Sequence, residues 1–414
     1  MDTTGEVLIG IDWGCARHYL VVRRGSQELF AGTVEHSGEG LASFTARLRE
    51  WCGGDFGAVK AAIELERGAV VDHFVDLGAQ VFVLPPKRSA ALRDALYTSA
   101  AKDDARDARV LLYALASNPG MLRPVRTLSP AQRDLRAACV ARHVLLADRN
   151  RCVLRIQDRL RGYFPEMLAA CRDALDRPWF AELFRMVPTP AAAATVRPSL
   201  LAARLRRARC RADVNALLKA LRAAPLRVAP GVAESAVRDV QAMLRAIKFS
   251  RDEERLVEKR TEAAMDAWRS ENPALRKQRE RDEEVLRSIP GIGDAVLAAL
   301  IAETAELLER RDYRALRLYS GVAAVTIQSG GSRQCRMRKA AAPRLRVAVY
   351  HWARVAAIRD ARSKERYAVL RAGGKTHGRA LRGVGDRLLA MACAMLKSGE
   401  TYRPDADDDA PETP

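Results

Sequence analysis

Short hydrophobic runs and helically spaced apolar residues alternate through the first 115 residues. The runs VLIGID, HYLVVRR, ELFAGTVEH, AVKAAIE and AQVFVLPP have the buried or alternating patterns of strands. Between them, LASFTARLREW and VVDHFVDLG carry apolar residues at helical spacing, and two more helical segments follow the last strand. The predicted order is β-β-β-α-β-α-β-α, which indicates a mixed sheet flanked by helices.

A different pattern begins at Ser129. From there to Phe164 the apolar positions step by alternating fours and threes, which is a heptad seam interrupted twice by Arg. A second helical stretch, about residues 233–286, is dense in charged pairs, and the two stretches are expected to form an antiparallel hairpin arm. The segment between them, with PTPAAAATVRPS and the basic ARLRRARCRAD, looks like a loop-rich insertion.

A break interrupts the helical pattern in VLRSIPGIGDAVLAALIAE. The helix is expected to stop at Pro290, turn through Gly291 and Gly293, and restart. A helix, a PGIG turn and a second helix form the signature of a helix-hairpin-helix, in which backbone N–H groups hold a phosphate. A simple connector between two helices is the alternative interpretation.

These changes of pattern divide the chain into four parts. Residues 1–118 are predicted to be an α/β domain, residues 119–285 a coiled-coil arm with a basic insertion, and residues 286–400 a helical domain. The acidic, proline-rich residues 401–414 are expected to be disordered. The predicted fold class is therefore α/β plus all-α.

Charge separates the two ends of the chain. The net charge is +19, yet residues 1–115 hold 16 Asp/Glu against 13 Lys/Arg, whereas residues 333–398 hold 17 Lys/Arg against 3 Asp/Glu. A basic C-terminal half favours a polyanionic partner. The residues expected to contact nucleic-acid phosphates are Lys102, Gly291, Gly293, Arg333, Arg336, Arg338, Lys339, Arg344 and Arg346.

Other classes of protein are disfavoured. No run approaches the roughly 18 apolar residues of a membrane span, and MDTTGEVLIGID lacks the features of a signal peptide. We therefore expect a cytoplasmic protein with no membrane partner. The 8 cysteines are scattered without a CxxC pair, which disfavours a zinc site or a disulfide framework.

Four carboxylates are positioned to meet in the N-terminal domain. The order of elements is that of the ribonuclease H-like fold, in which the first strand would bring Asp12 to the centre of the site and the neighbouring fourth strand Glu64. The later helix would supply Asp104 and Asp107, which share one face. Such a repulsive cluster is resolved by one or two Mg²⁺ ions. Glu66 is an alternative to Glu64 and Asp103 an alternative to Asp104, although Asp103 better fits a helix cap.

Six segments of the sequence are informative in combination: GIDWG, IELERG, LPPKRSAALRDALYTSAAKDDARDA, IPGIGDAVLAALIAE, RDYRALRLYSGVAAVTIQSGGS and LRVAVYHWARVA. Together they resemble the DEDD transposases of insertion-sequence family one-ten, which are relatives of Piv-type DNA invertases. The resemblance covers about residues 5–115 and 280–400. It implies a RuvC-like domain joined by a coiled-coil arm to a helical transposase domain, and assembly as a dimer or tetramer. It also implies a bridge RNA that guides the choice of target and donor DNA, and location at the nucleoid.

The resemblance also implies a serine nucleophile. The family's Ser-Gly falls on Ser329 in VTIQSGGS, and a serine hydroxyl can form a phosphoserine link with DNA. Ser332 and Ser320 are competing candidates. The sequence departs from the family pattern at Ala324, where Pro is usual, and at RKAAAPRLR, where Cys-Asn commonly precedes RLR.

Other hypotheses remain open at this stage. A metal-dependent nuclease of the junction-resolvase type would use the carboxylates without Ser329. An actin-like sugar kinase or ATPase would use IGIDWG as a phosphate loop, but no second Asp-Gly-Gly motif follows. A non-catalytic nucleic-acid binder, such as an inactive copy, would leave the spaced carboxylates unexplained.

Overall fold

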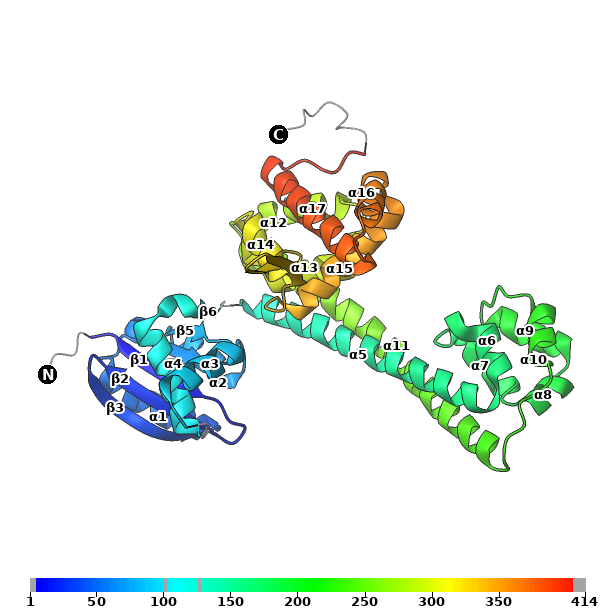
Figure 1. Ribbon diagram of the computed structural model, residues 1–414, viewed down its shortest axis with the longest axis horizontal. Coiled ribbons are helices and arrows are strands. Elements are labelled where there is room, and N and C mark those ends of the chain that lie inside the picture. Colours follow the sequence, from blue (N-terminus) through cyan, green and yellow to red (C-terminus); the bar gives the residue numbers. More distant parts are fainter. Residues whose placement is uncertain (1–4, 100–102, 126–127, 405–414) are drawn as a thin grey trace. The chain divides into compact units, whose positions relative to one another are not determined.

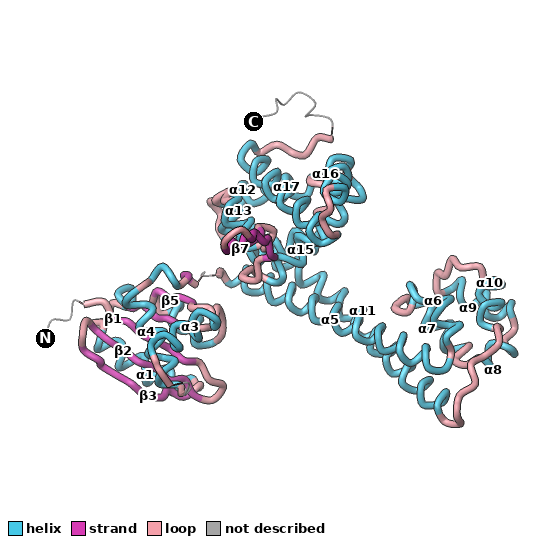
Figure 2. Tube along the Cα trace, viewed as in Figure 1, coloured by secondary structure: helices cyan, strands magenta, loops and turns pink. Residues whose placement is uncertain are grey.

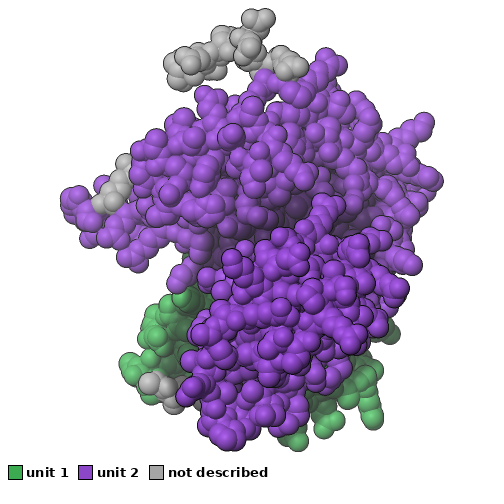
Figure 3. All heavy atoms as spheres, turned by 90° about the vertical axis from the view of Figure 1, so that its right-hand side faces the viewer, with its two compact units in different colours: residues 1–128 green, residues 129–414 purple. Residues whose placement is uncertain are grey.

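The computed structural model describes residues 5–99, 103–125 and 128–404, and it contains two compact units. Unit 1 comprises residues 1–128 and unit 2 residues 129–414, coloured separately in Figure 3. The expected disordered segment falls largely outside the described residues. Within the described ranges, no helix combines the length and hydrophobicity needed to cross a lipid bilayer.

Unit 1 is a mixed six-stranded sheet with helices on both faces (Figure 1). The strands, in the spatial order β3-β2-β1-β4-β5-β6, are β1 (Val7–Asp12), β2 (Arg17–Arg24), β3 (Gln27–Glu35), β4 (Val59–Ile63), β5 (Gln80–Val83) and β6 (Arg123–Pro124). The helices are α1 (Gly38–Trp51), α2 (Ala69–Asp76), α3 (Pro86–Leu96) and α4 (Asp104–Ser117). The predicted order of elements is confirmed. The short β6 pairs with β5 and extends the unit past residue 118, where the domain was expected to end.

Two apolar layers hold the helices of unit 1 against the sheet. One layer packs α1 and α2 against alternate residues of β1 and β4, including Ile9, Ile11 and Ile63. The other packs α4 against the opposite face, where Ala62 meets Leu111. Because side chains alternate along a strand, Leu8, Gly10 and Asp12 of β1 face α4.

A long antiparallel helix pair begins unit 2. It consists of α5 (Pro130–Tyr163) and α11 (Val232–Glu271), which lie side by side in Figures 1 and 2. Ser129 and Gln132 form a capping box at the start of α5, in agreement with the predicted helix start. The pairs Asp134–Arg260 and Arg159–Asp239 join the beginning of each helix to the end of the other, and Arg149–Glu254 joins their middle parts.

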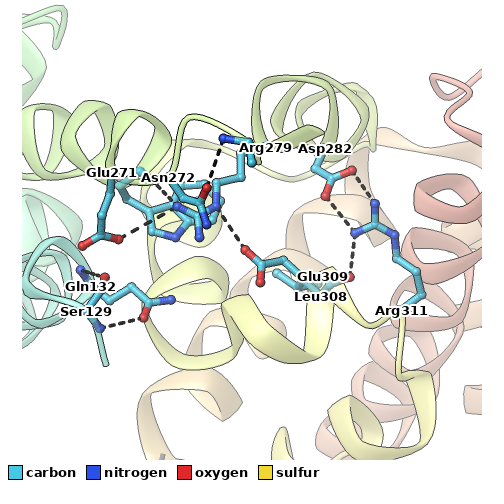
Figure 4. Close-up of polar contacts among 11 residues, drawn as sticks. Ser129, Gln132, Glu271, Asn272, Arg279, Asp282, Leu308, Glu309 and Arg311 are labelled. Carbon is cyan, nitrogen blue, oxygen red and sulfur yellow. Dashed lines mark hydrogen bonds and ion pairs between the residues drawn. The ribbon is translucent and has the colours of Figure 1, made fainter. Parts of the chain in front are cut away.

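The second helical stretch, predicted over about residues 233–286, consists of two helices. α11 ends at Glu271 and a separate helix, α12 (Arg276–Ser288), follows. Asn272 is followed by a proline, and the residue before a proline is disfavoured in helical conformation. The buried Arg279 of α12 ties the two helices together, because it lies over the Trp268 ring and also donates to Glu309 Oε1 at 3.1 Å (Figure 4).

The insertion between the two long helices is a helical bundle, not a loop-rich segment. It contains α6 (Pro165–Cys171), α7 (Pro178–Met186), α8 (Pro190–Thr195), α9 (Pro198–Arg207) and α10 (Val214–Leu221). Four of these helices have proline in their first turn, a position that needs no backbone N–H donor. The prolines that suggested loops therefore mark helix starts. Phe180, Leu183 and Phe184 are fully buried in its core.

The remainder of unit 2 is helical around a second core. Its elements after α12 are α13 (Asp294–Glu309), α14 (Tyr313–Tyr319), β7 (Ala324–Ser329), β8 (Ser332–Met337), α15 (Pro343–Arg359), α16 (Ala361–Ala372) and α17 (His377–Ser398). Trp352 of α15 is fully buried in this core. The domain predicted to be helical also contains strands, because β7 and β8 form an antiparallel hairpin.

Candidate active site

Asp12 and Glu64 lie at the carboxyl ends of two neighbouring parallel strands. Asp12 is the last residue of β1, and Glu64 directly follows β4. The register pairs Ile11 with Ile63, so the two acidic residues lie one step further along the same register. Ligands of open α/β sheets bind at the carboxyl ends of the strands. The structure thus brings these two predicted residues to one edge of the sheet.

Helix α4 covers the same edge on one face. A Cβ at Gly10 would lie 2.0 Å from the Ala108 carbonyl oxygen, so only glycine allows the helix to approach this closely. Asp12 lies two residues after Gly10 and therefore on the face that α4 covers. Ala62 packs against α4 as well, which places Glu64 on that face. Both carboxylates therefore project toward the helix that carries the other two predicted residues.

Asp107 is the buried carboxylate of α4, with an exposed fraction of 4%. Arg93 of α3 donates a hydrogen bond from Nη1 to Asp107 Oδ1 at 2.6 Å. This hydrogen bond is the largest cause of a raised pKa at Arg93, and the charges of Asp107, Asp94 and Glu64 act in the same direction. One guanidinium therefore interacts with carboxylates from α4 and from the sheet edge. Sequence reasoning missed Arg93, because nothing in its helix distinguishes it from a surface arginine.

The first turn of α4 divides its acidic residues by role. Asp103 is the N-cap, and its Oδ1 accepts a hydrogen bond from the Arg106 backbone N–H at 2.7 Å. Asp104 is exposed and precedes the buried Asp107 by one turn. The capping role expected for Asp103 is therefore observed. Lys102 lies outside the described residues.

The carboxylate oxygens of the candidate site are ligands of the type that binds a hard divalent cation, although they are not arranged as a complete metal site. Glu66 is exposed and pairs with Arg123 at 2.8 Å, so it is less suited to the site than Glu64. Asp12, Glu64 and Asp107 offer carboxylate oxygens from one face, and these are the ligands that Mg²⁺ prefers. Among the residues that the structure describes, no three acidic, His or Cys side chains are already arranged to hold a metal ion. A cation bound by Asp107 would compete with Arg93 for this carboxylate.

Ser329 lies at the tip of the β7–β8 hairpin in unit 2. The register places it opposite Ser332, across a two-glycine turn whose first residue, Gly330, has φ +55°. Glycine is favoured in such turns, because they require positive φ angles. Both serines are exposed. Ser320 is fully buried, and its hydroxyl donates to the Arg317 carbonyl at 3.3 Å, so a DNA strand cannot reach it.

Arg344 differs from the other arginines predicted to contact phosphate. Its Nε donates to Glu303 Oε1 at 2.6 Å, and Glu303 is buried with an exposed fraction of 6%. Arg136 of α5 contacts the same carboxylate at 3.2 Å. Arg344 therefore balances a buried charge in the core. We assign it a structural contact, not a free phosphate-binding position.

The remaining predicted basic residues lie on β8, on the segment that follows it and on α15. The side chains of Arg336 and Lys339 are exposed, and those of Arg338 and Arg346 are partly buried. The side chain of Arg333 lies outside the described part of the structure, although its backbone is in β8. The hairpin with Ser329 thus carries basic side chains.

The PGIG turn has the predicted form. α12 ends at Ser288, the chain turns with φ +89° at Gly291, and α13 starts after Gly293. The turn borders a groove of about 880 Å³ that α5 and α11 complete. The groove is lined by charges of both signs: Arg142, Arg269, Arg287, Arg359, Glu258, Glu262, Asp266 and Asp294. The Asp294 carboxylate at the start of α13 pairs with Arg287, so a phosphate would meet an acidic neighbour there.

Two sequence models of transposases match separate parts of the chain. The model of the IS110 DEDD transposases matches residues 9–165, and the model of the transposase IS116/IS110/IS902 family matches residues 283–368. The chain belongs to the IS110/IS116/IS902 transposase family. Transposases cut and rejoin DNA, so the chain is a DNA-cutting and rejoining enzyme.

Three similar proteins are known from Streptomyces and Sinorhizobium, and two of them are named for insertion elements. The transposase is 27% identical to the IS117 mini-circle protein of Streptomyces coelicolor, over 96% of this chain and 95% of that one. It is 27% identical to the 44.8 kDa protein of insertion element IS116 of Streptomyces clavuligerus, over 96% of each chain. With the y4uE protein of Sinorhizobium fredii it shares 34% identity over 49% of this chain, and that alignment spans 56% of the relative.

The two matched segments of the transposase contain the candidate residues of both units. The first includes Asp12, Glu64 and Asp107, and the second includes the PGIG turn and Ser329. Most of the helical bundle α6–α10 lies between the two matches.

Proposed function

We propose that this transposase cuts and rejoins DNA through a phosphoserine intermediate formed by Ser329, with Mg²⁺ held by carboxylates of a RuvC-like domain. The observation that carries the proposal is the position of Asp12 and Glu64 at the carboxyl ends of two adjacent parallel strands. Helix α4, which contains the buried Asp107, covers the same face of the sheet. The mixed sheet with α4 packed over the first and fourth strands supports the RuvC-like assignment. The exposed position of Ser329 on a basic hairpin supports its role as nucleophile.

The chemical step conserves the phosphodiester bond energy. Ser329 Oγ attacks the phosphorus, its proton passes to a base, and a P–Oγ bond forms as the bond to the 3′ oxygen breaks. The departing 3′ oxygen takes up a proton and becomes a free hydroxyl. Reversal of the step with another 3′-hydroxyl rejoins DNA and restores the serine.

The residues of unit 1 form the acidic part of the site. Asp12 and Glu64 present carboxylates from the sheet edge, and the hydrogen bond from Arg93 orients Asp107 in its buried position. Asp104 adds an exposed carboxylate one turn away. A divalent cation bound by these groups would supply Lewis-acid stabilisation of negative charge on phosphate oxygens.

The partners of the proposed reaction are nucleic acids and further copies of the chain. The net charge of +19 supports binding of target and donor DNA and of a guiding bridge RNA. The antiparallel pair α5–α11 fits a coiled-coil arm in a dimer or tetramer, in which acidic and serine halves of different chains can be combined. Such an assembly would act at the nucleoid, where its DNA lies.

A denaturing gel tests the proposed chemistry. Labelled DNA spanning the element junction is incubated with the protein and RNA transcribed from the flanking DNA, in Mg²⁺ or EDTA. A protein-linked DNA band should form only in Mg²⁺ and disappear in Ser329→Ala and Asp12→Ala. Ser332→Ala is the matched control, because Ser332 lies opposite Ser329 in the same hairpin. Loss of the band in Ser332→Ala alone would assign the nucleophile to Ser332.

A metal-dependent nuclease without a serine nucleophile is the second candidate. Ser329 lies beside a two-glycine turn, and serine is common in turns for conformational reasons. Its presence is therefore also explained without a role as nucleophile, which favours the nuclease. Mg²⁺-dependent cleavage that survives Ser329→Ala, fails in Asp12→Ala and leaves no protein-linked band would establish this function.

A further inference from the structure

The bundle α6–α10 carries a concentrated basic surface. Between Glu182 and Asp213 the chain has 7 arginines and no acidic residue. All of these arginines have exposed side chains: Arg185, Arg197, Arg204, Arg206, Arg207, Arg209 and Arg211. Figure 3 views unit 2 from the end that carries this bundle. Packing in the bundle core explains the leucines and phenylalanines of the bundle, but it does not explain the exposed arginines.

A groove of about 570 Å³ lies at one side of this surface, between α7, α9 and α11. Arg204 and Arg207 line it from α9, and Lys248 lines it from α11. Partly buried Leu244 and buried Ile247 contribute its apolar lining. Residues distant in the sequence therefore bring exposed cations to one concave site.

The acidic residues of the groove are already engaged. Asp176 contacts Arg149 and Arg251, Glu182 pairs with Arg185, and Asp252 pairs with Arg255. By contrast, no ion pair with Asp or Glu joins Arg204, Arg207 or Lys248 within the described residues. The uncompensated positive charge of the groove therefore comes from these three side chains.

The end of α9 supports a role beyond helix stability. Cations at a helix C-terminus interact favourably with its dipole, which accounts for part of the arginine cluster. It does not account for Lys248, which lies within α11. Arg209 also has φ +59°, a left-handed conformation that glycine adopts more readily. The chain thus keeps a basic side chain where a smaller residue would fit the turn better.

We propose that this groove and the adjoining arginines bind the phosphate backbone of duplex DNA. Arg and Lys are the main side chains that contact DNA phosphates. Single strands bind through stacking on aromatic residues, and sequence-specific RNA recognition uses the same contacts. Trp179, Phe180 and Phe184, the aromatic residues of the described bundle helices, are all buried or partly buried. Phe249 of α11 is exposed but does not line the groove, so the groove itself offers no exposed ring for stacking. Because the enzyme acts on DNA, duplex DNA beside the cut site is the matching partner.

Binding without cleavage tests this site. Full-length protein with Arg204→Ala, Arg207→Ala and Lys248→Ala is titrated with labelled duplex DNA in EDTA across a range of salt concentrations. We expect affinity to fall about tenfold or more, and the slope of log K against log salt to decrease in magnitude by about 3, one for each lost phosphate contact. An unchanged thermal unfolding midpoint would show that these exposed substitutions leave the fold intact.

A matched variant removes the same charge elsewhere. Arg151, Arg161 and Arg310 are exposed and each is paired with an acidic residue one turn away. Their combined replacement by Ala should change affinity by less than about threefold, because paired surface charges contribute little. Equal losses in the two variants would overturn the proposal in favour of a general charge effect.

Other outcomes separate the possible partners. Unchanged duplex binding in the groove variant would refute the site. Loss of binding to structured RNA with duplex DNA binding retained would assign the groove to RNA and also overturn the proposal. These measurements need no serine or metal chemistry, so their result is independent of the proposed cleavage mechanism.

Discussion

At the scale of single residues, the ion pair of Arg93 and Asp107 decides the state of the acidic site. Asp107 retains 6% side-chain exposure and Arg93 21%, so the carboxylate depends on its partner more than the guanidinium does. A buried carboxylate without a partner is costly, because the protein interior solvates charge poorly. Arg93 therefore supplies the positive charge that this cluster of acids requires when no cation is bound.

Replacement of Arg93 by Ala should expose this dependence. We expect the free energy of unfolding to fall by about 3 kcal/mol, the lower end for breaking a buried ion pair, because Arg93 is partly exposed. Mg²⁺ should then raise the unfolding temperature of Arg93→Ala more than that of the wild type, since the cation can replace the lost charge. Differential scanning fluorimetry with and without Mg²⁺ measures both effects.

Arg109→Ala provides the comparison for this experiment. Arg109 also lies on α4, but its pair with Glu28 at 3.4 Å is largely exposed and should contribute less than about 1 kcal/mol. A Mg²⁺ response equal in Arg93→Ala and Arg109→Ala would contradict competition between the cation and Arg93.

The positions of the acidic residues are easier to predict from the sequence than that of Arg93, which pairs with one of them. Asp12 and Glu64 were accessible to prediction because each lies at the end of a recognisable buried strand, and parallel pairing aligns strand ends. Arg93 was not, because its role depends on how α3 packs near α4, which no local pattern encodes. Gly10 shows the same limit, since only the packed structure reveals that α4 lies against it.

At the scale of elements, the PGIG turn joins two parts of the second core of unit 2. Trp352 of α15 donates its Nε1–H to the Pro290 carbonyl at 3.0 Å. A Cβ on Gly291 would lie 2.9 Å from the Trp352 carbonyl oxygen and from the Ala356 nitrogen. The turn is therefore held against the backbone of α15, and its glycine serves packing as well as conformation.

Alanine substitutions at the two glycines of this turn should differ in effect. Gly291→Ala is expected to destabilise the protein by about 2 kcal/mol or more, because it combines a positive φ with close backbone contacts. Gly293→Ala should cost less than about 1 kcal/mol, since φ is −103° and a Cβ added there would meet no described atom within 4 Å. Urea unfolding of both full-length variants measures the difference. Equal destabilisation would show that α15 yields to the added methyl group.

Elements with strong local signals were predicted, and those that depend on context were missed. The order of elements in unit 1 and the span of α5 follow from hydrophobic periodicity and caps. The bundle α6–α10 was missed because proline signals both loops and helix starts, and short helices show little periodicity. The β7–β8 hairpin was missed because its strands are largely exposed and so lack an alternating buried face.

At the scale of the whole molecule, unit 2 contains two separate hydrophobic cores. One includes the start of α5, the end of α11 and the helices α12–α17, and the other includes the end of α5, the start of α11 and the bundle. Between them, the seam position Arg149 is occupied by an ion pair with Glu254. A polar contact between the two cores couples their unfolding less strongly than continuous apolar packing would. The two cores should therefore unfold separately.

Phe180→Ala tests this separation. Phe180 is fully buried in the bundle, and its truncation should cost about 3–5 kcal/mol there. In hydrogen exchange measured by mass spectrometry, amides of residues 165–231 should lose protection while those of α13 and α15 keep theirs. Phe249→Ala removes an aromatic ring that is 63% exposed on α11 and should leave both regions unchanged. If Phe180→Ala also reduced protection in α13 and α15, the long helices would couple the two cores, and a ligand held by the bundle could then influence the hairpin that carries Ser329.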